Sequence, residues 1–175
     1  MEEGSILKIA VVGAESTGKT WLCEALADHY NTAWVPEYAR EYFNDSDLYN
    51  YTLEDLEIIA KKQKELEETM LKKAKLFLFC DTTLITLKIW AELEFHTTPR
   101  FIADSLAKIH YDHYFITDNQ MPWVADKLRE NKHSRELLLQ MNLAEVKKSG
   151  VSYTLITGRD EERLTNAIHV IDSLL

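Results

Sequence analysis

The sequence has few of the residues that would place it in a disulfide-rich, zinc-binding or membrane class. Only two of its 175 residues are cysteines, Cys23 and Cys80, and both lie in apolar periodic segments. We expect buried free thiols, because a zinc site needs more ligands at closer spacing. No apolar run approaches the roughly 20 residues that a membrane-spanning helix requires, and the acidic N-terminus lacks a signal or transit pattern. The sequence therefore favours a cytoplasmic protein without a membrane partner.

Basic residues are also scarce. Lys and Arg number 20 against 29 Asp and Glu, so the formal net charge is -9 at pH 7. Nucleic-acid binding usually needs a basic face, and this balance argues against a nucleic-acid partner. The chain has no linker, internal repeat or low-complexity tract, and its 46% apolar residues can fill one core. We expect a single domain over residues 1–175, of undetermined oligomeric state.

Short apolar runs alternate with helical patterns, which is typical of a parallel sheet covered by helices. Most runs are continuous rather than alternating, as expected for strands buried on both faces. The sequence therefore predicts an α/β fold of three layers, a P-loop NTPase fold with a five-stranded parallel sheet flanked by helices. The expected strands are Leu7–Val12, Thr32–Val35, Leu76–Cys80, Tyr114–Thr117 and Tyr153–Ile156.

Helix signals fill the gaps between the expected strands. An amphipathic stripe covers Gly18–Tyr30. Thr52, with Asp55 three residues on, has the capping pattern of a helix that continues to about Lys75. Asp160 is the expected cap of the last helix.

Residues 13–20, GAESTGKT, match the phosphate-loop pattern G-x-x-x-x-G-K-[ST] in full, between an expected strand and helix. Gly13 and Gly18 permit a tight turn whose amide N–H groups face an anion, and the helix adds its positive dipole end. Lys19 can reach the β- and γ-phosphates of ATP, and the Thr20 hydroxyl can bind Mg²⁺. The predicted nucleotide contacts are Gly13, Ala14, Glu15, Ser16, Thr17, Gly18, Lys19, Thr20 and the adjoining Trp21.

Two carboxylates follow expected strands. Asp81 ends the run LFLFCD, which resembles a Walker B strand and places a carboxylate next to the metal. The alternative is that Asp81 caps the helix that follows. Glu37 follows the second strand, at the sheet edge where ligands bind in open α/β sheets, and Arg40 lies one helical turn on. Glu37 can accept a proton from an attacking hydroxyl or hold a sugar hydroxyl; the alternative is a surface ion pair with Arg40.

A charged segment, MPWVADKLRENKHSRE, lies between the fourth strand and the next helix. It resembles the lid of small nucleotide and nucleoside kinases, in which arginines close over the γ-phosphate and exclude water. We expect a helical lid at about residues 121–140, with Arg129 and Arg135 as its catalytic arginines. The alternative is a solvated charged turn. Arg159, after the last strand, is expected beside the adenine by analogy with such kinases.

The motifs GAESTGKT, PEYAREYF, FCDTTLIT and WVADKLR…SRE occur in the order and spacing of a known family. They resemble the nicotinamide riboside kinase domain of NadR-type NAD-biosynthesis proteins, in the AAA-domain/NadR-like group of P-loop ATPases. The resemblance covers nearly the whole chain and implies transfer of phosphate from ATP to the 5′-hydroxyl of nicotinamide riboside. It implies Gly18, Lys19 and Thr20 at the ATP phosphates and Mg²⁺, Glu37 and Arg40 at the riboside, Asp81 at the metal or acceptor hydroxyl, and Arg129 and Arg135 in the lid.

The third position of one motif differs from the family pattern D-T-D, because Thr83 stands where the family has a second carboxylate. The sequence leaves open whether Glu37 or Asp81 accepts the proton. It also leaves open a kinase for another nucleoside or metabolite, and a regulatory nucleotide-binding ATPase. A flat cationic nicotinamide ring suits an aromatic wall. The aromatic candidates are Tyr38, Tyr42, Trp90 and Phe95, of which Tyr38 and Trp90 are the predicted substrate contacts.

Overall fold

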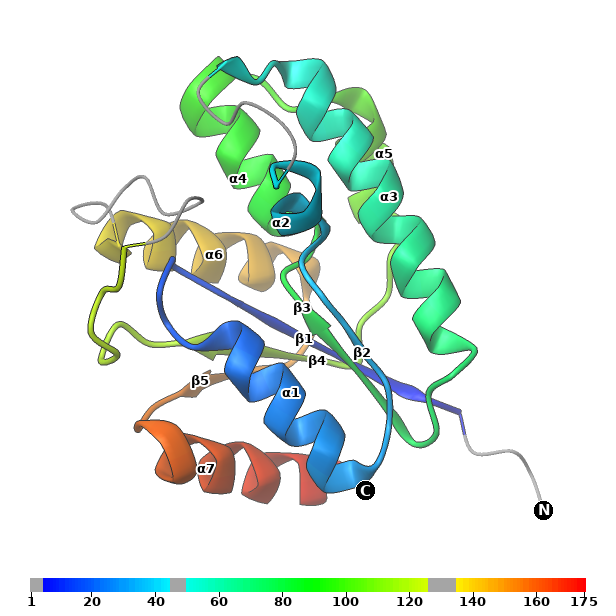
Figure 1. Cartoon of the computed structure of the whole chain (residues 1–175), viewed down its shortest axis with the longest axis vertical. Coiled ribbons are helices and arrows are strands. Elements are labelled where there is room, and N and C mark those ends of the chain that lie inside the picture. The colour runs from blue at the N-terminus through cyan, green and yellow to red at the C-terminus, as the bar shows by residue number, and fades with distance from the viewer. Residues whose placement is uncertain (1–4, 45–49, 126–134) are drawn as a thin grey trace.

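The structure, a computed structural model, describes residues 5–44, 50–125 and 135–175. At its centre is a five-stranded sheet in the order β2-β3-β1-β4-β5, in which all neighbouring strands are parallel (Figure 1). The predicted fold class is confirmed. The elements are β1 (Leu7–Gly13), α1 (Lys19–Tyr30), β2 (Trp34–Val35), α2 (Tyr38–Tyr42), α3 (Leu53–Leu71), β3 (Phe77–Asp81), α4 (Leu84–Phe95), α5 (Arg100–Leu106), β4 (His113–Thr117), α6 (Arg135–Ser149), β5 (Tyr153–Ile156) and α7 (Asp160–Asp172).

Both faces of the central strands β3, β1 and β4 are buried under helices, which explains why these strands are apolar without alternation, whereas the edge strand β5 is exposed at Tyr153 and Leu155. Successive side chains of a strand point to opposite faces. On one face, Ile9 of β1 packs in a cluster with Leu22 of α1 and Ile171 of α7. On the other face, its neighbour Ala10 packs in a cluster with Val146 of α6 and with residues of α4. The central strand β1 is therefore covered on both sides, and its carboxyl end opens into the loop before α1.

A second group of helices, α2 to α5, packs together beside the sheet (Figure 1). Its apolar core includes Leu56 of α3 and Leu84 of α4. The predicted capping box at Thr52 is confirmed: the Asp55 N–H donates to the Thr52 hydroxyl, and the Asp55 carboxylate accepts from the Thr52 N–H at 2.6 Å. The helix ends at Leu71, four residues before the predicted end.

One predicted helix cap needs correction, and part of the predicted lid falls outside the described residues. The N-cap of α7 is Arg159, whereas Asp160, the predicted cap, is the first helical residue. Of the predicted lid, residues 126–134 lie outside the described parts of the chain, and Arg129 is among them. Cys23 and Cys80 are buried free thiols, as predicted. Within the described ranges, no helix is long and apolar enough to cross a membrane.

Candidate active site

The loop between β1 and α1 depends on two glycines. Gly13 has φ 145° and Gly18 has φ 78°, values that residues with a side chain rarely adopt. A Cβ atom on Gly13 would lie 2.9 Å from the carbonyl oxygen of Thr117 in β4 and closer still to its hydroxyl. Gly13 is therefore required by the close approach of β4, and Gly18 by the left-handed turn from which α1 starts.

Thr17 fixes the loop from the inside. It is fully buried, and its hydroxyl donates to the Ala14 carbonyl at 2.8 Å. The same hydroxyl is hydrogen-bonded to the Thr117 hydroxyl, 2.6 Å away. Because these bonds hold the loop before any ligand binds, little of the binding free energy of an anion is needed to order it.

Lys19 extends across the loop, and its ammonium donates to the Ala14 carbonyl at 2.7 Å. Burial lowers the pKa of Lys19, while the nearby carboxylates of Asp81 and Glu37 oppose that shift. Lys19 is half-buried, and its ammonium is hydrogen-bonded to a neutral carbonyl, so its charge can still be paired with an anion. The loop thus offers a cation to an anionic ligand.

Asp81 ends β3, which is the neighbour of β1, and is 1% exposed. The Thr20 hydroxyl donates to its Oδ2 at 2.5 Å. Burial raises the pKa of Asp81, and the charge of Lys19 and the Thr20 hydrogen bond oppose that rise. The alternative role of Asp81 as a helix cap is wrong, because the N-cap of α4 is Thr83, whose hydroxyl accepts from the Ile85 N–H at 3.2 Å.

Glu37 stands between β2 and α2, and Arg40 lies on its side of the helix as the spacing predicts. The Arg40 Nε donates to the Glu37 carboxylate at 3.1 Å. The Glu37 side chain is 16% exposed and the Arg40 side chain 38%, so the carboxylate end of the pair is more buried than the guanidinium end. Burial, followed by the nearby Asp81 carboxylate, raises the pKa of Glu37, while Lys19 and Arg40 oppose the rise. Two carboxyl groups with raised pKa values therefore lie close to the loop ammonium.

A cavity of about 400 Å³ lies between the phosphate loop and helices α2, α4 and α6. The loop supplies Gly13 and residues 15–21 at one end, so Trp21 lies on its wall. Helices α4 and α6 supply most of the other wall, where apolar and polar side chains mix. The lining residues outside the loop are Glu24, Glu37, Arg40, Thr82, Thr86, Ile89, Trp90, Leu93, Glu94, Leu138 and Asn142.

Of the four aromatic candidates, Trp90 is the one that lines this cavity. Its indole N–H donates to the Tyr51 hydroxyl at 2.5 Å, which fixes the ring. Tyr38, expected at the substrate, packs instead with Tyr42 and Phe95 in the cluster of α2 to α5. The reason is helical spacing: Tyr38 and Tyr42 are four residues apart, their ring centroids lie 6.4 Å apart, and both turn toward the core.

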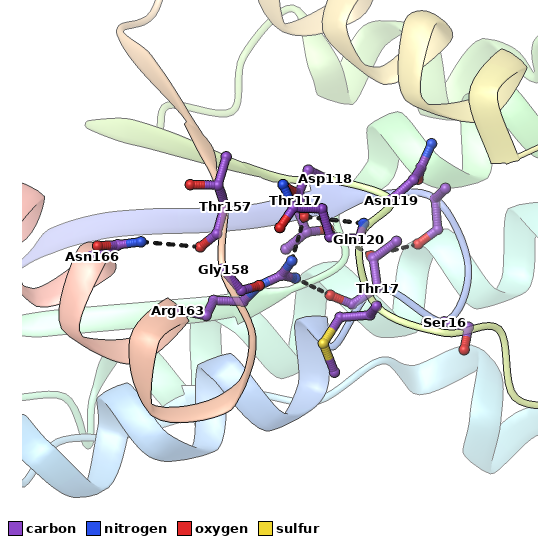
Figure 2. A network of polar contacts seen from close by, with 12 residues as sticks. Ser16, Thr17, Thr117, Asp118, Asn119, Gln120, Thr157, Gly158, Arg163 and Asn166 are labelled. Carbon is purple, nitrogen blue, oxygen red and sulfur yellow. Dashed lines mark hydrogen bonds and ion pairs between the residues drawn. The ribbon is translucent and has the colours of Figure 1, made fainter.

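A buried arginine that the sequence pattern did not single out supports the loop from behind. Arg163 of α7 is 1% exposed, and its guanidinium donates to the Thr17 carbonyl and pairs with Asp118 (Figure 2). Its Nε donates to the Gly158 carbonyl at 2.9 Å. Arg159, the residue expected beside the adenine, is exposed and does not line the cavity. The final helix therefore contacts the phosphate loop through Arg163, one helical turn after Arg159.

Arg135 begins α6 and reaches the loop through backbone contacts. Its Nη2 donates to the carbonyls of Met121 at 2.7 Å, Ser16 at 3.3 Å and Asn119 at 3.4 Å. Arg135 thus ties the segment after β4 to the phosphate loop, although it does not line the cavity. The other predicted lid arginine, Arg129, lies outside the described residues.

A parallel sheet of this order, with a glycine-lysine loop after β1 and buried carboxylates after β2 and β3, defines a P-loop fold of the kinase type. The chain matches the model of an AAA domain family over residues 8–163 and belongs to that family. The resemblance to NadR-type proteins is confirmed by relatives over most of the chain. The trifunctional NAD biosynthesis/regulator proteins NadR of Escherichia coli (strain K12) and Salmonella typhimurium (strain LT2) are each 24% identical to it over 179 residues.

These alignments cover 95% of this chain and 42% of each relative, so the chain spans less than half of their length. Among solved structures, a NadR protein in complex with NR has a TM-score of 0.82 at 21% identity, covering 97% of this chain and 50% of that one. A thymidylate kinase from Ehrlichia chaffeensis has a TM-score of 0.62 at 15% identity, over 98% and 100% of the two chains. A deoxyadenosine kinase from M. mycoides has a TM-score of 0.58 at 16% identity, over 95% and 99%.

Proposed function

We propose that the protein is a phosphotransferase that moves the γ-phosphate of ATP to the 5′-hydroxyl of nicotinamide riboside. The observation that carries this proposal is that one cavity contains both the phosphate loop and the Glu37–Arg40 pair. A donor phosphate and an acceptor hydroxyl held in one cavity react as if at very high effective concentration. The NadR relatives, aligned over 95% of the chain, support a riboside as the acceptor.

On the donor side, Lys19 and the N–H groups of the loop would hold the β- and γ-phosphates. The hydrogen-bonded oxygens of Thr20 and Asp81 are ligands of the kind that Mg²⁺ prefers, so these two residues fit the ion. When bound, Mg²⁺ neutralises charge on the transferred phosphate. We keep Arg135 and Arg129 as proposed lid residues. The remaining proposed nucleotide contacts are Gly13, Ala14, Glu15, Ser16, Thr17, Gly18 and Trp21.

The charges on the cavity wall favour a nucleoside acceptor over a nucleotide. Among the described lining residues beyond the loop, Arg40 is the one cation, and it is already paired with Glu37. Glu94 adds a further carboxylate to the same wall. An acceptor that carries its own phosphate would be repelled by these carboxylates. A cationic pyridinium ring, by contrast, is attracted by Glu94 and by the face of Trp90.

The geometry favours Glu37 over Asp81 as the group that takes the proton of the attacking hydroxyl. Glu37 lines the cavity, whereas Asp81 is buried beside it and accepts a hydrogen bond from Thr20. A raised pKa makes the Glu37 carboxylate a stronger base than an exposed glutamate. We therefore assign Glu37 to proton transfer and to positioning of the 5′-hydroxyl, and Asp81 to the metal side.

The test is ADP release by purified protein with ATP and Mg²⁺, measured without acceptor and with a panel of acceptors. The panel contains nicotinamide riboside, adenosine, cytidine and thymidine monophosphate. We expect nicotinamide riboside to stimulate ADP release at least about tenfold over the acceptor-free rate, since near-attack positioning needs both substrates. Mass spectrometry of the product should show nicotinamide mononucleotide.

Matched lysine variants separate this activity from a contaminant. Lys19→Ala should reduce turnover by at least about a hundredfold, because it removes a charge aimed at the transferred phosphate. Lys61→Ala, at an exposed ion pair with Glu57, should have no effect. ADP release that no acceptor stimulates would instead indicate a regulatory ATPase. Stimulation by adenosine, cytidine or thymidine monophosphate alone would indicate a kinase for a different acceptor.

A further inference from the structure

A buried amide on α6 faces the cavity with one of its hydrogen-bonding groups unused. Asn142 lines the cavity and is 2% exposed. Its Nδ2 donates to the Leu138 carbonyl one turn back, at 2.8 Å. Its carbonyl Oδ1 has no hydrogen-bond partner among the described residues. A buried acceptor of this kind is unfavourable in the free protein, and a ligand donor in the cavity would satisfy it.

A second unused polar atom lies on α4. Thr86 lines the same cavity, and within the described ranges its buried hydroxyl has no hydrogen-bond partner. A threonine inside a helix commonly bonds its hydroxyl to a carbonyl in the preceding turn, and no such bond is made here. The Thr86 hydroxyl is therefore available as either donor or acceptor.

The cavity brings Thr86 of α4 and Asn142 of α6 together, since both side chains line it, and an ion pair joins the two helices beside it. Lys88 of α4 and Glu145 of α6 are 2.7 Å apart, and both side chains are less than 20% exposed. Burial alone would raise the pKa of Glu145, but hydrogen bonds from Lys148 and Lys88 lower it, so its negative charge is retained. On α4 the cavity face carries Thr86, Ile89, Trp90 and Leu93, at spacings of three and four residues, and on α6 it carries Leu138 and Asn142. The rest of this wall is largely apolar, being formed by Ile89, Leu93 and Leu138.

We propose that Asn142 and Thr86 bind an uncharged hydrogen-bonding group of the acceptor substrate, with Asn142 Oδ1 accepting from a ligand N–H or O–H. The inference rests on the proposed riboside kinase function and specifies which ribosides the site takes. A few polar groups in a mostly apolar pocket fix the orientation and identity of a ligand. A carboxylate at the same place would face the Asn142 oxygen and be rejected.

Two parts of a nicotinamide riboside can supply the donor: the carboxamide N–H₂ and the ribose 2′- and 3′-hydroxyls. Three probes distinguish them, namely nicotinamide riboside, nicotinic acid riboside and nicotinamide 2′,3′-dideoxyriboside. Calorimetric titration gives a Kd for each with wild-type protein, Asn142→Leu and Thr86→Val. Asn166→Leu is the matched control, because Asn166 also donates its amide to a backbone carbonyl, that of Thr157 at 3.2 Å, but lies on α7 outside the cavity lining.

We expect Asn142→Leu to raise the Kd for nicotinamide riboside about 10- to 100-fold, as for loss of a buried hydrogen bond. Thr86→Val should act in the same direction, and Asn166→Leu should leave the Kd unchanged. The fold-increase in Kd caused by Asn142→Leu should be smaller for the probe that lacks the bonded group. A smaller increase with nicotinic acid riboside identifies the carboxamide as that group, and a smaller increase with the dideoxyriboside identifies the ribose hydroxyls.

Equal penalties for all three probes, or changes below about twofold, would overturn the inference, because a specific hydrogen bond discriminates between ligands. If circular dichroism shows that Asn142→Leu is unfolded, the nearly isosteric Thr86→Val decides by the same criteria. Since the readout is binding, a protein that binds the ribosides without phosphorylating them contradicts the proposed function and leaves this inference standing. A wild-type protein that binds none of the three contradicts both.

Discussion

The guanidinium of Arg163 in α7 donates a hydrogen bond to the backbone carbonyl of Thr17 in the phosphate loop, 146 residues earlier in the chain (Figure 2). The same guanidinium pairs with Asp118, directly after β4. The loop is therefore held on one side by β4, through the Thr17–Thr117 hydroxyl pair, and on the other by the last helix. The shape of the loop therefore depends on its contacts with β4 and α7 as well as on the glycine-lysine motif.

Replacing Arg163 by methionine is expected to destabilise the protein strongly. The change leaves Asp118 buried without its cation, and breaking a buried ion pair in this way typically costs about 3–5 kcal/mol. Urea unfolding monitored by circular dichroism measures the loss. The control is Arg100→Met, at an ion pair whose arginine side chain is 94% exposed, for which we expect less than about 1 kcal/mol. Equal stability of the two variants would contradict the assigned role of Arg163.

Gly13→Ala should be far more damaging than Gly150→Ala. Both glycines have positive φ, 145° and 72°, so both substitutions strain the backbone. A methyl group on Gly13 would also collide with the Thr117 backbone, whereas nothing lies within 4 Å of the corresponding position on Gly150. We expect a loss of about 2–4 kcal/mol for Gly13→Ala and of about 1 kcal/mol for Gly150→Ala. Thermal unfolding of the two variants checks the difference, and similar melting temperatures would contradict it.

The pH dependence of turnover should identify Glu37. Its pKa is raised above that of an ordinary glutamate by burial and by Asp81. The ionised form accepts the proton, so kcat should fall as the pH is lowered through this raised pKa. Glu37→Gln should lower kcat about 10²- to 10⁴-fold and remove the acidic limb of the profile. The Asp81→Asn variant should retain the acidic limb. An acidic limb that persists in Glu37→Gln would show that another group titrates.

Asp81→Asn should stabilise the ligand-free protein while impairing catalysis. Burial raises the folded-state pKa of Asp81 above its unfolded value, so the folded protein binds this proton more tightly. Stability from this group is then greatest below the unfolded pKa and falls as the pH rises through the folded one. At neutral pH the asparagine variant should melt a few degrees higher. Asp104→Asn, on the exposed ion pair of α5, is the control, and a lower melting temperature for Asp81→Asn would refute the prediction.

The sequence predicts the residues that stand next to strand ends and misses those that act across the fold. Glu37 and Asp81 are predictable because the carboxyl ends of parallel strands meet at one edge of the sheet. Arg163 lies in a helix that begins DEER, a pattern typical of a solvated face, and two of its partners, Thr17 and Asp118, come from distant segments. The pattern also does not show that Thr83, rather than Asp81, caps α4. Asn142 can be recognised as a candidate site residue only from the structure, in which α4 and α6 line one cavity.

The contact of Arg163 with the phosphate loop has a consequence for the nascent chain. Thr17 is synthesised early, but its carbonyl gains its arginine partner only after 146 further residues have been added. The loop is synthesised before α7, so a ribosome-bound fragment that ends before Arg163 lacks the hydrogen bond from Arg163 to the Thr17 carbonyl. The Thr17 carbonyl therefore has this hydrogen bond only in a chain that has been synthesised through Arg163.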